Sequence, residues 1–155
     1  MHISLKPIDA LSSRELLQIL KLRLDVFVVE QGCAYADIDA ADTRSDTLHL
    51  APRSARESDP PIACARLIAP RHARDVVRIG RMAVHPGHRG KGLARQMLLV
   101  LIERAQRDHQ QHALELAAQT HALSLYRSAG FEVCSATYLD DGIEHVDMRY
   151  AMASP

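Results

Sequence analysis

The sequence has no surplus of charge of either sign and no long hydrophobic run. Its 19 Lys and Arg residues balance 19 Asp and Glu residues, and the pI is about 7.1. A broad nucleic-acid or membrane-binding surface needs an excess of Lys and Arg, so we expect neither partner. No stretch has the apolar length that a membrane helix requires, and the first ten residues lack a signal-peptide pattern.

Cysteine is scarce, and its spacing excludes the common redox and metal motifs. Cys33, Cys64 and Cys134 are an odd number and include no C-x-x-C pair. We therefore expect reduced thiols in a reducing compartment, which predicts a cytoplasmic protein. Cys33 is expected to be a small, mostly buried thiol. The nine histidines form no evident cluster with carboxylates or thiols, so we expect surface histidines and no metal site.

The patterns that are present suit one domain spanning residues 1–155. A first helix follows a capping box, in which Ser12 caps the helix and Glu15 reaches back. Its expected apolar face consists of Leu16, Leu17, Leu20, Leu24, Phe27 and Val28. The expected strands are 2–6, 48–51, 62–69, 76–84, 113–117, 131–139 and 144–152, and the expected helices are 13–29, 93–105 and 122–128.

This order of elements predicts an α/β (α+β) fold, in which helices cover both faces of a mixed sheet. Strand 76–84, the helix after it and strand 113–117 should form a right-handed crossover between parallel strands. That helix has the clearest amphipathic stripe in the chain, formed by Leu93, Ala94, Met97, Leu98, Leu101, Ile102 and Ala105.

A glycine-containing turn, Arg89-Gly90-Lys91-Gly92-Leu93-Ala94, precedes this helix. The first amides of a helix lack internal partners, and the helix dipole adds positive charge there. Glycines let a phosphate approach the backbone, so the turn predicts a pyrophosphate site rather than a plain helix entry. The turn matches neither G-x-x-x-x-G-K-[ST] nor G-x-G-x-x-G, which excludes the two common nucleotide motifs.

The turn instead contains Arg-x-x-Gly-x-Ala, at Arg89, Gly92 and Ala94, which resembles the acyl-CoA signature of the GCN5-related N-acetyltransferase (GNAT) family. The segments IGRMAVHPGHRGKG and AQTHALSLYRSAGFEV are similar to that family in the same order, and LRLDVFVVEQGCAYADID is similar to its ElaA-like branch. The resemblance implies a mostly antiparallel sheet of six to seven strands with two splayed parallel central strands. It also implies acetyl-CoA as cosubstrate and no metal.

The resemblance further implies roles for individual residues. Tyr126 occupies the place of a tyrosine that protonates the leaving CoA thiolate, a task that suits a phenol. Gln119 stands where many relatives carry a CoA-binding asparagine. The remaining cofactor-binding residues would be Met82, Ala83 and Val84 along the pantetheine arm, and Arg89, Gly90, Lys91, Gly92, Leu93 and Ala94 around the pyrophosphate.

Strand 76–84 lacks the glutamate that many relatives use as a base. The candidates that remain are Glu30, Asp37, Asp39, His49, His121 or water.

The acidic segment 30–46 lacks the glycine and glutamate of an EF-hand loop. It predicts either a solvated loop or an acidic wall that attracts a cationic amine. Arg66 and Arg81 lie in otherwise apolar strands, and they either pair with nearby acids or line the acceptor cleft. We favour the cleft.

These observations predict an N-acetyltransferase that moves an acetyl group directly from acetyl-CoA to a primary amine. One alternative is a catalytically silent acyl-CoA-binding module, which the missing strand glutamate favours. Another is an interaction domain that uses the apolar face of the first helix. A small-molecule or peptide amine is the expected acceptor, and a homodimer is left open.

Overall fold

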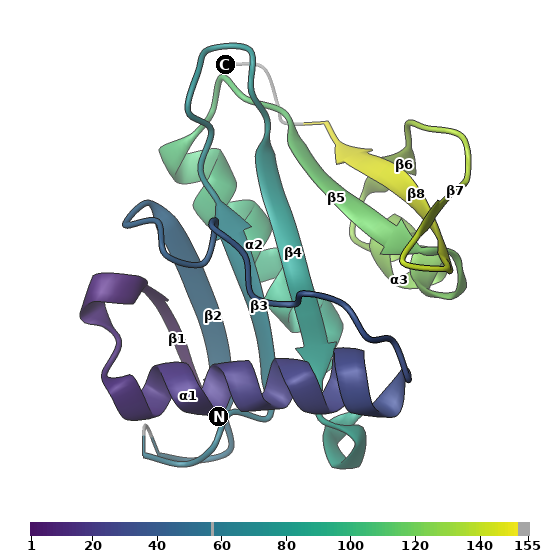
Figure 1. Ribbon diagram of the computed structural model, residues 1–155. Coiled ribbons are helices and arrows are strands. Elements are labelled where there is room, and N and C mark those ends of the chain that lie inside the picture. Colours follow the sequence, from purple (N-terminus) through teal and green to yellow (C-terminus); the bar gives the residue numbers. More distant parts are fainter. Residues whose placement is uncertain (57, 152–155) are drawn as a thin grey trace.

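In the computed structural model, residues 1–56 and 58–151 are described, and eight strands form one sheet. The sheet order is β1-β2-β3-β4-β5-β8-β6, and β7 pairs with β8 (Figure 1). The strands are β1 His2–Pro7, β2 Thr47–Arg53, β3 Ala63–Ile68, β4 Val77–Val84, β5 Leu114–Gln119, β6 Phe131–Val133, β7 Tyr138–Asp140 and β8 Ile143–Tyr150. The α-helices are α1 Ser13–Arg23, α2 Leu93–Asp108 and α3 Leu123–Ser128; four further helical segments are η1 Ile8–Ala10, η2 Leu24–Glu30, η3 Pro86–His88 and η4 Thr120–Ala122.

The predicted mixed, mostly antiparallel sheet is confirmed. All paired strands are antiparallel except β4 and β5, which pair in parallel as the crossover predicts. The strand expected at 131–139 is two strands, β6 and β7, which brings the total to eight. The chain between them loops out opposite Asp147, whose amide donates to the Ser135 hydroxyl and whose carbonyl accepts from the Cys134 amide.

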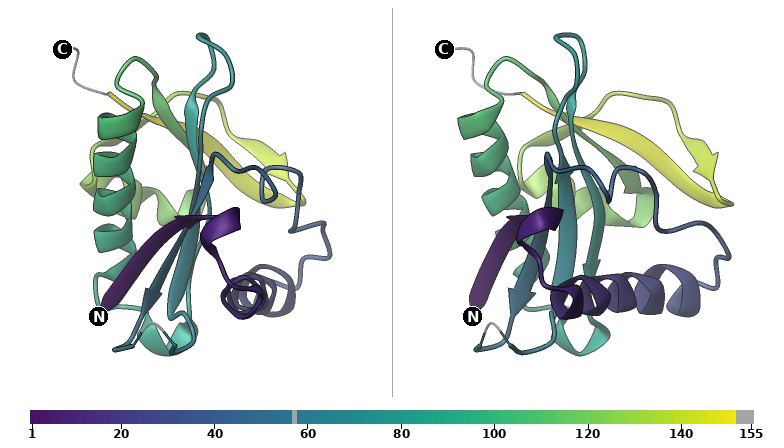
Figure 2. Two further views of the ribbon diagram at one scale, coloured as in Figure 1. Left: turned by 90° about the vertical axis from the view of Figure 1, so that its left-hand side faces the viewer. Right: turned by 60° about the vertical axis from the view of Figure 1, so that its left-hand side comes forward.

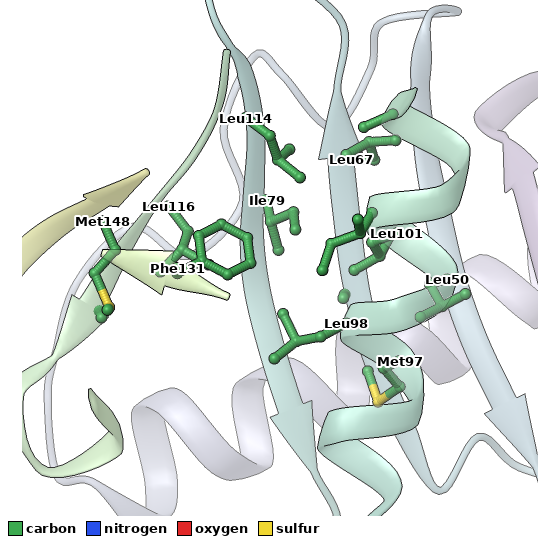
Figure 3. Packing of buried hydrophobic residues seen from close by; sticks show 14 of the residues in the cluster. Leu50, Leu67, Ile79, Met97, Leu98, Leu101, Leu114, Leu116, Phe131 and Met148 are labelled. Carbon is green, nitrogen blue, oxygen red and sulfur yellow. The ribbon is translucent and has the colours of Figure 1, made fainter. Parts of the chain in front are cut away.

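Helices cover both faces of the sheet, as expected. Helix α1 packs on β3 and β4 from one side of the sheet. Helix α2 packs on the same two strands from the other side, where α3 packs on β5 and β6 (Figure 2). The main core lies under α2, where its predicted stripe meets the sheet and Phe131 (Figure 3). A smaller core under α1 contains Ile19, Leu22, Val26, Ala51, Cys64 and Ala83.

The start of α1 is as predicted, but its apolar face is not. The Ser12 hydroxyl accepts from the Glu15 amide at 3.2 Å, and the Glu15 carboxylate accepts from the Ser12 amide at 2.8 Å. Leu17 and Leu24 are 67% and 39% exposed, so the predicted face is wrong at these two positions, whereas its other four residues are half-buried. The helix instead buries Arg23 together with Ile19 and Leu22, because acidic partners compensate its charge. The segment expected to be helical to residue 29 continues as a π-helix, η2.

Strand β4 separates from β5 partway along its length. Residues 77–79 pair with residues 114–116, and the two strands then diverge (Figure 1). The backbone groups beyond residue 79 on this edge of β4 therefore have no partner strand. This is the splayed parallel pair that the family resemblance implies.

A bulge lies in β4 at the point of separation. Cys64 of β3 lies opposite Ala83, whereas Arg66 lies opposite Gly80, so β4 holds one extra residue. Arg81, in the bulge, has a φ of 52°. A bulge bends its strand and shifts the alternation of backbone groups by one residue. The bulge therefore decides which β4 amides face the gap.

Candidate functional site

A cavity of about 450 Å³ lies between β4 and β5 where they diverge. Volumes in this range are typical of small-molecule sites. Its wall includes seven of the predicted site residues: Met82, Ala83, Val84, Arg89, Ala94, Gln119 and Tyr126. The other four, residues 90–93, connect Arg89 to Ala94 and are not part of the wall. The structure thus brings together residues from β4, β5, α3 and the turn before α2.

Two β4 amides point into this gap. The His85 amide donates to the Ile62 carbonyl at 2.9 Å, beside β3. Successive residues of a strand present their backbone groups to opposite edges. Met82 and Val84 therefore present theirs to the gap. An extended ligand that carries amide groups can bond to this edge as an additional strand would.

The turn before α2 presents backbone amides without protein partners. Gly90 and Gly92 both have a φ of 73°, and a Cβ at either position would meet no atom within 4 Å. The first helical bond is donated by the Gln96 amide to the Gly92 carbonyl, at 3.1 Å. Across residues 1–56 and 58–151, no group accepts from the amides of residues 90–95. Free amides at a helix N-terminus favour an anion such as a phosphate.

Arg89 joins this turn to the end of η2. Its Nη1 and Nη2 donate to the two carboxylate oxygens of Glu30 at 2.7 and 2.8 Å, and its Nε donates to the Val84 carbonyl at 3.0 Å. The Arg89 hydrogen bonds hold the pKa of Glu30 below its usual range. Glu30 lines the cavity, but this pair keeps its carboxylate ionised and engaged.

Tyr126 of α3 reaches the cavity wall from the core side. Its ring packs edge-on against Phe131, with centroids 6.3 Å apart. Burial raises the pKa of Tyr126 to about 12, so the phenol keeps its proton near neutral pH. Its hydroxyl has no protein hydrogen-bond partner in the described part of the chain. It is therefore a proton donor that faces the cavity and is not otherwise engaged.

Residues 30, 31 and 33 form part of the cavity wall. Besides the Glu30 pair, the Gln31 and Gln119 side-chain amides bond to each other reciprocally at 3.4 and 3.2 Å. The Cys33 thiol donates to the Asp141 carbonyl at 3.4 Å. The end of η2 thus contacts the turn before α2, the end of β5 and the β7–β8 turn. Gln119 lies on the cavity wall with its amide in this pair.

The acidic segment is neither a solvated loop nor an acidic wall. Asp37 and Asp42 are 2% and 3% exposed, and both accept from the buried Arg23, at 2.9 and 2.7 Å. The Asp39 carboxylate accepts hydrogen bonds from both Nη atoms of Arg66, at 2.8 and 2.6 Å. These aspartates neutralise arginines from α1 and β3, so they are not free to attract an amine.

Arg81 completes this network and contacts the cavity as well. Its guanidinium donates to Asp37 at 2.9 Å and lies 5.4 Å from the ring centroid of Tyr35. Arg81 and Tyr35 both line the cavity, whereas Arg66 does not. The expectation that both arginines line the cleft therefore holds for Arg81 and is wrong for Arg66, whose partners are acids.

The candidate bases occupy different places. Asp37 and Asp39 are engaged by arginines, and His49 is 1% exposed beside the Asp42 carbonyl, so none of the three lines the cavity. Burial lowers the pKa of His49. Glu30 and His121 do line the cavity.

The sequence interpretation missed the residues that the β7–β8 hairpin contributes. Asp140, Asp141, Ile143 and His145 line the cavity, and they are far in sequence from β4 and the turn before α2. The turn signal Asp140-Asp141-Gly142 predicts a hairpin, but no local pattern shows that its tip meets residue 33. Only the pairing of β8 with β5 brings the hairpin there.

The expectations for histidine and cysteine are met in part. His49 is buried, against the prediction of surface histidines. Cys64 is buried, Cys33 is half-buried, Cys134 is exposed, and all three are free thiols.

No group of three or more His, Cys, Asp or Glu in the described ranges is placed to hold a metal ion. No helix in these ranges has the length and apolar character needed to span a membrane.

Comparisons with known proteins agree with this geometry. The model of a family described as an acetyltransferase (GNAT) domain matches residues 42–152. The chain is 41% identical to a UPF0039 protein of Schizosaccharomyces pombe over 145 residues, 93% of each chain. It is 34% identical to protein ElaA of Escherichia coli over 138 residues, 89% of this chain and 88% of ElaA.

Solved structures show the same similarity. The crystal structure of Escherichia coli ElaA matches with a TM-score of 0.88 at 30% identity. That of an acyl-CoA N-acyltransferase from Pseudomonas aeruginosa matches with a TM-score of 0.87 at 34% identity. In both cases the match covers 97% of this chain and 100% of the other.

Proposed function

Because the chain belongs to the GNAT acetyltransferase family, we propose that it transfers an acetyl group from acetyl-CoA to a primary amine. The observation that carries the proposal is the row of unpartnered amides at residues 90–95, next to a cavity bounded by the free edge of β4. The amides suit a diphosphate, and the strand edge suits the amide-containing arm that joins it to a thioester. Acyl-CoA thioesters have both features, and acetyl-CoA is the one that we propose.

We assign the parts of the site as follows. The amides of Gly90, Lys91, Gly92, Leu93 and Ala94 and the residue Arg89 hold the diphosphate. The backbone of Met82 and the amide of Val84, with Ala83 between them, hold the pantetheine arm, while the Val84 carbonyl stays bonded to Arg89. Gln119, once its pair with Gln31 opens, contacts the arm from β5.

The reaction is direct transfer from thioester to amine. The neutral amine attacks the thioester carbonyl, and a β4 amide stabilises the oxyanion. The carbon–sulfur bond then breaks, and the Tyr126 hydroxyl gives its proton to the sulfur. Burial keeps that proton on Tyr126 until charge develops on the leaving sulfur.

The acceptor is proposed to be a small-molecule or peptide amine, and a cytoplasmic location accords with the three free thiols. The protein should release CoA thiol in the presence of acetyl-CoA and at least one member of a panel of polyamines, amino acids and short peptides. Thiol release is the measurement, and protein with Gly92→Glu is the control. Stabilisation by acetyl-CoA without thiol release from any amine would instead support the silent binding module.

The missing carboxylate on β4 and the engaged state of Glu30 are the observations that favour this second candidate. The interaction-domain alternative keeps the exposed Leu17 and Leu24 of α1 in its favour. The buried face of α1 already packs on the sheet through Ile19 and Leu22. If acetyl-CoA does not stabilise the protein against unfolding, the interaction-domain alternative would be favoured.

A further inference from the structure

We propose that His145 is the general base that accepts a proton from the attacking amine nitrogen. The inference deepens the proposed function, on which it rests, and assigns a residue to the role that β4 leaves open. His145 is half-buried in β8 and lines the same cavity as Tyr126. Three observations carry the assignment: its tautomer, the face of the sheet to which it points and its neighbours.

The tautomer follows from one hydrogen bond. The Nδ1 atom of His145 lies 2.9 Å from the Ile143 carbonyl oxygen, which can only accept. Nδ1 must therefore carry the hydrogen, and in the neutral ring Nε2 holds the free lone pair. The ring is also held by Tyr138, which stacks on it at a centroid distance of 6.1 Å and an angle of 23°. His121, which also lines the cavity, is exposed, and no side-chain hydrogen bond to another described residue fixes its ring.

The face follows from the alternation of β8. Val146 and Met148 point into the main core on the side of α2 and α3. Their neighbour His145 therefore points to the opposite face. Gln119 lies opposite His145 in register, and its side chain bonds to Gln31 on the α1 side, which agrees with this direction.

Tyr126 packs against the main core, so the two side chains reach the gap from opposite faces of the sheet. This arrangement suits direct transfer, since the proton acceptor near the nitrogen and the proton donor near the sulfur then occupy separate positions around the thioester. Tyr126 then donates a proton to the sulfur in one step, and His145 accepts a proton from the nitrogen in another.

The proton balance is complete within these groups. The amine nitrogen forms a bond to the carbonyl carbon and becomes positively charged, and it gives one proton to Nε2 of His145. The carbon–sulfur bond breaks, and Tyr126 gives one proton to the thiolate. Transfer of the proton from His145 to Tyr126 through solvent restores both groups, so a neutral amine and acetyl-CoA yield an amide and CoA.

The charged neighbours of His145 are compatible with this role. Asp140 and Asp141 lie at the hairpin turn next to it, and Arg81 from β4 is neutralised by Asp37 and Asp39. Cys33, His121 and the Tyr138 hydroxyl, which donates to Asp147, are the other titratable groups nearby. Among the described charged residues that line the cavity, Asp140 and Asp141 have no ion-pair partner, and their negative charge suits an amine acceptor.

The test is the pH profile of kcat/KM for His145→Gln, with the amine that the panel identifies. We expect a loss of about 10²-fold on the plateau, together with a changed pH profile. The dissociation constant for acetyl-CoA should stay within about twofold, and imidazole should restore part of the rate to His145→Ala. His72→Gln, an exposed histidine outside the cavity, should behave as wild type.

An unchanged profile in His145→Gln overturns the assignment, as does the same change of profile in His121→Gln instead. These outcomes differ from failure of the proposed function. In that case the wild-type protein itself shows neither acetyl-CoA-dependent stabilisation nor thiol release.

Discussion

Gly92 is a single residue at which the proposed anion site can be tested. At a φ of 73° an L side chain is strained, yet a Cβ there meets no protein atom within 4 Å. Gly92→Ala should therefore cost only about 1–2 kcal/mol of folding free energy. Gly92→Glu adds a negative charge where we place the diphosphate, and CoA binding should fall at least about 10²-fold relative to Gly92→Ala. Isothermal titration with CoA checks this, and equal affinities for the two variants would contradict our placement of the diphosphate.

Tyr126 offers a second test at the residue scale. Tyr126→Phe keeps the ring that packs against Phe131 but removes the proton donor. We expect kcat to fall about 10²-fold or more, with the dissociation constant for acetyl-CoA nearly unchanged. Tyr150→Phe, at a half-buried tyrosine outside the cavity wall, is the matched control. If both variants keep the wild-type kcat while chemistry is rate-limiting, Tyr126 is not the acid.

Gly130 and Gly142 both have a positive φ, but only Gly130 lies close to another side chain. Comparing alanine variants of the two separates the cost of backbone strain from the cost of a steric clash. Gly130 has a φ of 96°, and a Cβ there would lie 2.9 Å from Tyr150, whose ring packs on Phe131. Gly142 has a φ of 81° and open space around it. Gly130→Ala should lower the free energy of unfolding by about 1–3 kcal/mol more than Gly142→Ala does. Denaturant unfolding measures the difference, and equal losses would show that Tyr150 moves aside freely.

At the scale of elements, the segment 37–42 is held to α1 and β3 by buried charge. Burial alone would raise the pKa of Asp42, but hydrogen bonds from Arg23, the Asp39 amide and Arg66 outweigh it and leave the pKa well below the usual range. Asp42→Asn should therefore destabilise the protein by about 3–5 kcal/mol near neutral pH. Asp46→Asn, at an exposed pair with Arg44, should cost about 1 kcal/mol or less.

The same network predicts that the free energy of unfolding depends on pH in the acidic range. Since the folded-state pKa of Asp42 is depressed, its contribution is present above the unfolded-state pKa of about 3.9 and is lost as pH falls below it. The unfolding free energy of the wild type should therefore fall more steeply than that of Asp42→Asn between about pH 4 and pH 2. Parallel curves for the two proteins would show that Asp42 is not paired in solution.

Local patterns predicted the elements well where a single physical signal dominates. The α2 stripe from Leu93 to Ala105, the Ser12 capping box and the Asp140–Gly142 turn all appear in the structure. The α1 face was partly wrong because hydrophobicity alone assigns Arg23 to solvent. Its burial depends on carboxylates 14 and 19 residues away, which no helical period reveals.

At the scale of the whole molecule, the site depends on contacts that the sequence does not display. The pairs Glu30–Arg89, Gln31–Gln119 and Cys33–Asp141 join residues 59, 88 and 108 positions apart. Roles for the turn before α2 and for Tyr126 could be proposed from the sequence because a sequence similar to that of the family surrounds each. His145 and the hairpin could not, since their place in the cavity follows from the sheet order β5-β8.

The central claim is that free amides before α2 bind the diphosphate of the coenzyme. Its most direct test compares the affinities of CoA and pantetheine, which lacks the diphosphate, for the wild-type protein and for Gly92→Glu. Our account predicts that the wild type binds CoA at least about 10²-fold more tightly than pantetheine, a difference of about 2.7 kcal/mol, and that Gly92→Glu removes this preference. Equal affinity of the wild type for the two ligands would contradict it.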